Sequence, residues 1–171
     1  MAQIATSILH DPLDPAAELA ALTGAGTASG GLASFVGQVR AEDGLEALEL
    51  EHYPGVTDAA LAQIAGTAAE RWPLHHAVIR HRVGRMTPGE PIVFVAASAA
   101  HRRAALDAVG YMIDCLKTEA PFWKRVHTAA GSHWVEATDN DRRAADAWLA
   151  PDTRNNAQEP DTDERTDPPG R

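Results

Sequence analysis

The segment from Pro91 to Ala97 constrains the fold more than any other, because its residues PIVFVAA carry no charge. A strand this apolar is predicted to lie centrally in a sheet. A long helix is predicted directly after it, with Ser98 as its cap and with its end before Pro121. The apolar face of that helix would be formed by Leu106, Val109, Met112, Ile113 and Leu116.

Strand and helix patterns alternate through the rest of the chain as far as residue 149. The other predicted strands are Ile4–Leu9, Gly31–Arg40, Ala47–Tyr53, Ala77–Val83, Phe122–His127 and His133–Ala137. The other predicted helices run from a cap at Asp14 to Leu22, from a cap at Thr57 to Pro73, and from Asp139 to about Leu149. Hairpin-type connections are expected at Asp43-Gly44 and across Ala129 to Ser132. This order predicts an α+β fold with a mixed or antiparallel sheet and packed helices.

Composition predicts one domain, residues 1–150, followed by a tail. Residues 151–171 consist mostly of Asp, Glu, Pro, Asn and Thr, so we expect a disordered acidic tail. No run approaches the roughly 20 apolar residues of a membrane helix, and no export signal precedes the first strand, so a cytoplasmic location is expected. The net charge of −9 argues against general nucleic-acid binding and makes any anion site a local one.

The two lysines are the best indication of chemistry. Of the 15 basic residues 13 are arginine, and the two lysines, Lys117 and Lys124, lie in one segment, LKTEAPFWKR. Guanidinium stays protonated, whereas an amine in a desolvated or cation-rich site can lose its proton and attack a carbonyl. A chance placement of two lysines on a solvated surface is the alternative.

A second basic group, His101-Arg102-Arg103, is predicted in the first turn of the long helix, where the helix dipole disfavours cations. A bound phosphate or carboxylate would offset that cost, although a solvated face is the alternative. Arg40 could point into the same cleft, although a surface arginine is the alternative. About 16 residues at 1.5 Å each put this site roughly 24 Å from Lys117, so a symmetric dimer is one way to bring the two together.

Other reactive groups carry less weight. Cys115 lies beside Leu116 and one turn after Met112, which favours a buried structural thiol over a nucleophile. The eight histidines show no metal-ligand spacing, so no metal and no cofactor are assigned.

Several ordered motifs resemble the large, catalytic subunit of molybdopterin synthase, the MoaE family. They are FVGQVR, LELEHYPG, RWPL, HRVG, PGEPIVFV, AHR, LKTEAPFWKR and WVEA, between about residues 33 and 137. The resemblance implies an α/β hammerhead-type fold and a homodimer of large subunits within a heterotetramer, flanked by two small ubiquitin-like sulfur-carrier (MoaD-like) subunits. It also implies sulfur transfer from the carrier's C-terminal thiocarboxylate to cyclic pyranopterin monophosphate, which forms the molybdopterin dithiolene.

By motif matching, the resemblance makes Lys117 and Lys124 the catalytic lysines. It implies that the substrate or the carrier terminus is held by Arg40, His101, Arg102 and Arg125. The chain departs from the family pattern in the Ala-Glu-Asp loop after Arg40 and at Gln38, Leu106, Val126 and Thr138. Some family members have an arginine where this chain has Thr138, so one phosphate contact is in doubt here. Arg142 or Arg143 is a candidate replacement for it. The alternatives are a non-catalytic carrier-binding scaffold of the same family and, more remotely, a phosphate-ester hydrolase using His101.

Overall fold

The computed structural model describes residues 1–24, 28–42, 44–135, 143 and 146–148. Its strands are β1 (Gln3–Leu9), β2 (Gly31–Gln38), β3 (Leu45–His52), β4 (Leu74–Arg82), β5 (Gly84–Met86), β6 (Pro91–Ala99), β7 (Phe122–Thr128) and β8 (Gly131–Val135). Its helices are α1 (Pro15–Thr23), α2 (Val56–Arg71) and α3 (Arg102–Thr118). The predicted α+β class is confirmed.

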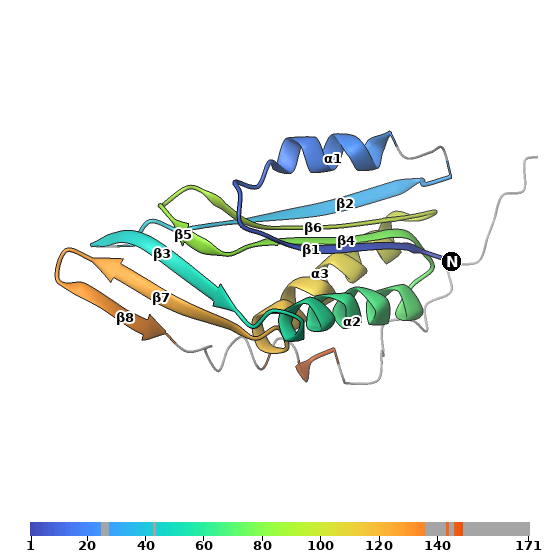
Figure 1. Cartoon of the computed structure of the whole chain (residues 1–171). Coiled ribbons are helices and arrows are strands. Elements are labelled where there is room, and N and C mark those ends of the chain that lie inside the picture. Colours follow the sequence, from blue (N-terminus) through green and yellow to red (C-terminus); the bar gives the residue numbers. More distant parts are fainter. Residues whose placement is uncertain (25–27, 43, 136–142, 144–145, 149–171) are drawn as a thin grey trace, which may run out of the picture.

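The first sheet has the strand order β1-β4-β6-β2, in which β1 and β4 are parallel and the other neighbours antiparallel. The central position predicted for the apolar strand is confirmed, because β6 lies between β4 and β2. Helix α1 covers one face of this sheet, while α2 and α3 cover the other (Figure 1). A strand buried on both faces explains the uninterrupted apolar run of β6.

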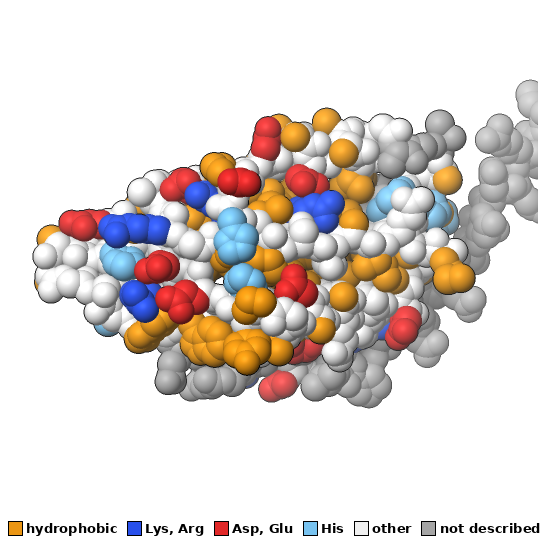
Figure 2. All heavy atoms as spheres, viewed as in Figure 1, with side chains coloured by type: hydrophobic (Ala, Val, Ile, Leu, Met, Phe, Trp, Pro, Cys, Tyr) orange, Lys and Arg blue, Asp and Glu red, His pale blue; other side chains and the backbone are white. Residues whose placement is uncertain are grey.

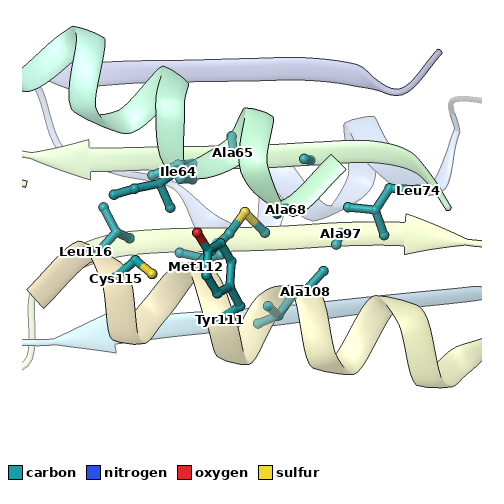
Figure 3. Close-up of a cluster of buried hydrophobic side chains, with 14 of the residues drawn as sticks. Ile64, Ala65, Ala68, Leu74, Ala97, Ala108, Tyr111, Met112, Cys115 and Leu116 are labelled. Atoms are coloured by element: carbon teal, nitrogen blue, oxygen red, sulfur yellow. The ribbon is translucent and has the colours of Figure 1, made fainter. Parts of the chain in front are cut away.

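The main core lies between the first sheet and the pair α2–α3. Its largest fully buried side chains include Leu61 and Ile64 from α2, Ile79 from β4 and Met112 from α3. Figure 3 shows the α2 and α3 side chains meeting over the sheet, with Cys115 among them. Apolar spacing in α2 and α3 therefore reports burial as expected, with the exception of Leu106, which is exposed.

The second sheet is antiparallel, with the strand order β5-β3-β7-β8, and forms one end of the molecule (Figure 1). It is joined to the first sheet by a small core of Val39, Leu48, Leu50 and Met86. The predicted hairpin of the last two strands is confirmed, since β7 and β8 pair from Lys124 opposite Val135 to Thr128 opposite Gly131.

The hairpin predicted at Asp43-Gly44 is wrong. β2 pairs with β6 in the first sheet, whereas β3 pairs with β5 and β7 in the second. The register of β2 against β6 shifts between Gly37 and Gln38, and just after β2 the Val39 N–H donates to the Glu90 carbonyl (3.0 Å). The connection therefore carries the chain from one sheet to the other.

Two predicted helix caps are also wrong. Gly55 precedes α2, and its N–H donates to the Asp58 carboxylate (2.9 Å), whereas Thr57 is already inside the helix. Ser98 belongs to β6, which continues to Ala99, and its hydroxyl lies 2.8 Å from His76 Nδ1. His101 is the residue that precedes α3.

The described C-terminal residues pack against α2 and α3. The Trp148 indole donates to Asp114 (2.8 Å) and lies against the rings of Trp72 and Tyr111. The helix predicted from Asp139 to about Leu149 falls mostly outside the described residues, as does the predicted tail. None of the described helices combines the length and the apolar character needed to cross a membrane.

Candidate active site

The two lysines lie on consecutive elements joined by a short elbow. Lys117 is exposed in the last turn of α3, and Lys124 is exposed on β7, opposite Leu50 of β3 and Val135 of β8. α3 ends at Thr118 and β7 begins at Phe122, so three residues, 119–121, connect the elements. α3 ends and β7 begins where the second sheet meets α3 (Figure 1), and each of these two elements carries one of the lysines.

The pairing register places Lys124 on the inner face of the second sheet. Side chains directly opposite in an antiparallel pair share a face, so Lys124 shares the face of the buried Leu50. That face packs toward the first sheet through Leu48 and Met86. The amine consequently extends from the rim of an apolar core.

Arg40 lies at the same end as Lys124. Its guanidinium is exposed and forms an ion pair with the Glu42 carboxylate. The pKa of Glu42 is lowered, first by the hydrogen bond from Arg40, then by the charge of Arg40 and to a lesser degree by that of Lys124. One carboxylate thus lies within electrostatic reach of two predicted site residues.

Sequence reasoning missed Glu42. Its only sequence signal is the Ala-Glu-Asp loop, which departs from the family pattern. In the structure its carboxylate accepts a hydrogen bond from Arg40, and the charge of Lys124 makes a minor contribution to its lowered pKa.

Arg125 lies on the opposite face of the second sheet from Lys124. Its guanidinium pairs with Glu51 (3.3 Å) and Glu49 (3.7 Å) and stacks 4.2 Å from the centre of the Trp134 ring. Basic and acidic side chains alternate over this sheet (Figure 2). Arg125 is thus held by contacts within its own sheet, away from the inner face.

His101 and Arg102 lie at the far end of α3 from the lysines. Both are exposed, and α3 has 17 residues, which at about 1.5 Å each span roughly 25 Å. Gly31, at the start of β2, packs against this helix start, whereas Arg40 follows the other end of β2. The expectation that Arg40 shares a cleft with His101 and Arg102 is therefore wrong within one chain.

The helix start is packed closely. A Cβ on Gly30 would lie 2.3 Å from the Ala100 carbonyl oxygen, and one on Gly31 would lie 2.9 Å from the Arg102 Cα. Arg103 pairs with Asp107 one turn later (2.8 Å). The two glycines therefore allow β2 to approach the segment that presents His101 and Arg102.

Cys115 is a buried thiol, as its helix position predicted. Burial raises its pKa to about 12, so it stays protonated at neutral pH.

The departure from the family pattern at Thr138 lies outside the described residues, as does Arg142, one of its two candidate replacements. The other, Arg143, is exposed. Among the described residues no three His, Cys, Asp or Glu side chains are grouped as a metal site requires.

The fold and the placement of the two amines define an α+β protein with a lysine-centred candidate active site. The family profile described as MoaE protein matches residues 8–119. A molybdopterin synthase catalytic subunit from Pseudomonas aeruginosa is 48% identical over 148 residues, covering 85% of this chain and 99% of the relative. The chain belongs to the MoaE family, and the prediction that it is an enzyme of molybdenum-cofactor biosynthesis is confirmed.

Solved structures agree with this assignment. The MoaE protein of Burkholderia ambifaria is 46% identical, with a TM-score of 0.73, and the match covers 88% of this chain and all of that one. A complex of subunits 1 and 2 of molybdopterin-converting factor from Helicobacter pylori matches with a TM-score of 0.67 over 78% of this chain and 90% of that one. At 21% identity the second match shows the shared fold alone.

Proposed function

We propose that this chain transfers sulfur from the C-terminal thiocarboxylate of a small ubiquitin-like carrier to cyclic pyranopterin monophosphate, forming the molybdopterin dithiolene. The family supports the pathway, and the name of the Pseudomonas aeruginosa relative, a catalytic subunit, supports a partner subunit. The observation that carries the proposal is the position of Lys117 and Lys124, on either side of one elbow and at the end that also holds Arg40.

The two amines have separate roles in this proposal. Lys117 acts as the covalent or acid–base group, and Lys124 stabilises negative charge on the thiocarboxylate. The carrier brings the sulfur, so a thiol of this chain is not required, in keeping with the burial of Cys115. In this proposal Arg40, whose partner Glu42 also senses the charge of Lys124, holds an anionic group of the carrier terminus or the substrate.

His101 and Arg102 complete the site only if a second copy supplies them. They lie roughly 25 Å from the lysines along α3, so one chain does not bring them together. We propose a homodimer of large subunits, within a heterotetramer, in which the helix start of one copy approaches the lysine end of the other. Arg125 remains a predicted binding residue, and its ion pairs with Glu49 and Glu51 would have to open for that role.

Separate replacements of the lysines test the proposal, with dithiolene formation from thiocarboxylated carrier as the assay. Lys117→Ala and Lys124→Ala should each lower the rate by about a hundredfold or more. Lys117→Arg is the matched control for charge, since it keeps the cation and removes an amine that can lose its proton. We expect it to be nearly as slow as Lys117→Ala.

The alternatives give different results. A non-catalytic scaffold would bind the carrier equally well in all three variants and show no lysine-dependent turnover. A phosphate-ester hydrolase would release phosphate from a model ester and depend on His101. Wild-type turnover in both alanine variants would contradict the proposal. The cytoplasmic location stays a prediction.

A further inference from the structure

The elbow between the two lysines is clamped by a residue from a distant part of the chain. Thr57, in the first turn of α2, is completely buried, with an exposed fraction of 0%. Its hydroxyl donates to the Pro121 carbonyl (3.1 Å) and accepts from the Tyr53 N–H (3.0 Å). A hydroxyl has one proton to donate, so the two bonds use it in both of its roles.

The hydrogen bond from Thr57 to Pro121 holds the backbone segment that connects the two lysines. Pro121 lies four residues after Lys117 and three before Lys124. On the amino-terminal side, the Glu119 N–H donates to the Cys115 carbonyl (2.8 Å) and ends the helix. On the other side, the Phe122 N–H donates to the Ala120 carbonyl (2.9 Å), and the Thr57 hydroxyl holds the carbonyl of the same Pro121–Phe122 peptide, so the two bonds together fix its orientation.

A ring stack holds the residue that follows. The His81 imidazole of β4 lies 4.0 Å from the Phe122 ring at an interplanar angle of 20°. Its Nδ1–H donates to the Arg82 carbonyl (3.0 Å), which fixes the plane of the imidazole. The elbow thus has a directional hydrogen bond at Pro121 and a flat apolar support at Phe122.

Packing alone does not explain a threonine at position 57. Valine has nearly the same shape and would fill the same space without placing a hydroxyl in the core, where an unpaired hydroxyl is costly. Threonine therefore differs from valine by the two hydrogen bonds of its hydroxyl, one from the Tyr53 N–H and one to the Pro121 carbonyl of the elbow.

We propose that Thr57 is a positioning residue: through the Pro121 carbonyl it sets the placement of Lys117 relative to Lys124. This inference rests on the proposed function, because the placement matters only if both amines act on one substrate. A displacement of about 1 Å between reacting groups is enough to lower a rate by up to about a hundredfold.

Thr57→Ser and Thr57→Ala test this in the full-length chain with wild-type carrier. Both variants lose the buried methyl group, and they differ only in the hydroxyl. We expect Thr57→Ser to retain a single-turnover rate within about threefold of wild type, and Thr57→Ala to be slower by about ten- to a hundredfold. The KM for the carrier should change little in either, because the carrier-binding groups are untouched.

A matched control lies in α1. The Thr23 hydroxyl bonds only to the Ala20 carbonyl of its own helix (3.0 Å) among the contacts of the described residues. Thr23→Ala should turn over at the wild-type rate. Thermal unfolding of all variants separates loss of rate from loss of fold, since the rates are compared at a temperature where each is folded.

Equal rates for Thr57→Ser and Thr57→Ala would overturn the inference, because the hydroxyl would then have no role beyond packing. If Thr57→Ala is fast while Lys117→Ala and Lys124→Ala are inactive, only the positioning role fails. If the lysine variants are active, the proposed function fails, whatever Thr57 does.

Discussion

The burial of His81 predicts a loss of stability that begins below about pH 6.5, before most carboxylates titrate. Desolvation lowers its pKa from 6.5 to about 4, partly opposed by the hydrogen bond to the Arg82 carbonyl. The ring lies against Phe122, so it is neutral in the folded protein at neutral pH. Below about pH 6.5 the unfolded chain binds a proton at this position and the folded chain does not.

The sign and size of the effect follow from linkage. Because the unfolded state binds more protons between pH 6.5 and about 4, stability rises with pH across that window and falls as the pH is lowered. Each pH unit costs about 1.4 kcal/mol, so the free energy of unfolding should drop by about 2 kcal/mol between about pH 7.5 and about pH 5.

Urea denaturation of wild type and His81→Phe at several pH values measures this effect. The phenylalanine keeps a ring against Phe122 and does not titrate. The unfolding free energy of this variant should therefore drop by about 2 kcal/mol less than that of wild type over the same pH range. His10→Gln, which removes an exposed imidazole, is the control and should behave as wild type. Parallel profiles for wild type and His81→Phe would refute the reasoning.

Four further substitutions have expected outcomes. Gly31→Ala should lower the unfolding free energy by about 1–3 kcal/mol, because the new Cβ would meet backbone atoms of α3. Gly66→Ala should raise it by about 0.5–1 kcal/mol, because Gly66 lies within α2 and faces open space. Thermal unfolding measures both effects. Cys115→Ser should transfer sulfur at nearly the wild-type rate, and an inactive but folded variant that binds carrier would count against a carrier-borne sulfur. Hydrogen bonds from the Thr87 N–H and then from the Arg82 side chain lower the pKa of Glu90 from 4.5 to about 2. Glu90→Gln should therefore be less stable than wild type at neutral pH, and the difference should vanish as the pH falls from 4.5 through about 2. A difference that persists in acid denaturation curves would contradict this.

The elements themselves were predictable from the sequence because their periodicity reports burial. The apolar run of β6 and the helical spacing of α2 and α3 correspond directly to contacts in the core. Strand partners were not predictable in the same way. The Asp43-Gly44 signal indicates only that the chain turns, and whether β3 pairs with β2 or with β7 depends on strands more than 70 residues away.

Polar residues near helix starts were misread for a related reason. Thr57 and Ser98 have the composition of caps, but their hydroxyls bond to Pro121 and His76, which are distant in sequence. Local sequence does not reveal a long-range partner. The same limit applies to the candidate site, where the lysine elbow was visible as a motif and the ion pair between Arg40 and Glu42 was not.

The most direct test of a lysine-centred site is to locate where the carrier terminus attaches. The full-length chain is incubated with thiocarboxylated carrier, and the products are digested and mapped by mass spectrometry. Attack of a lysine amine on the thiocarboxylate carbon would form an amide and release hydrogen sulfide. We expect that amide on Lys117 or Lys124. Attachment only at the Met1 amine, with sulfur transfer still proceeding, would contradict the proposed site.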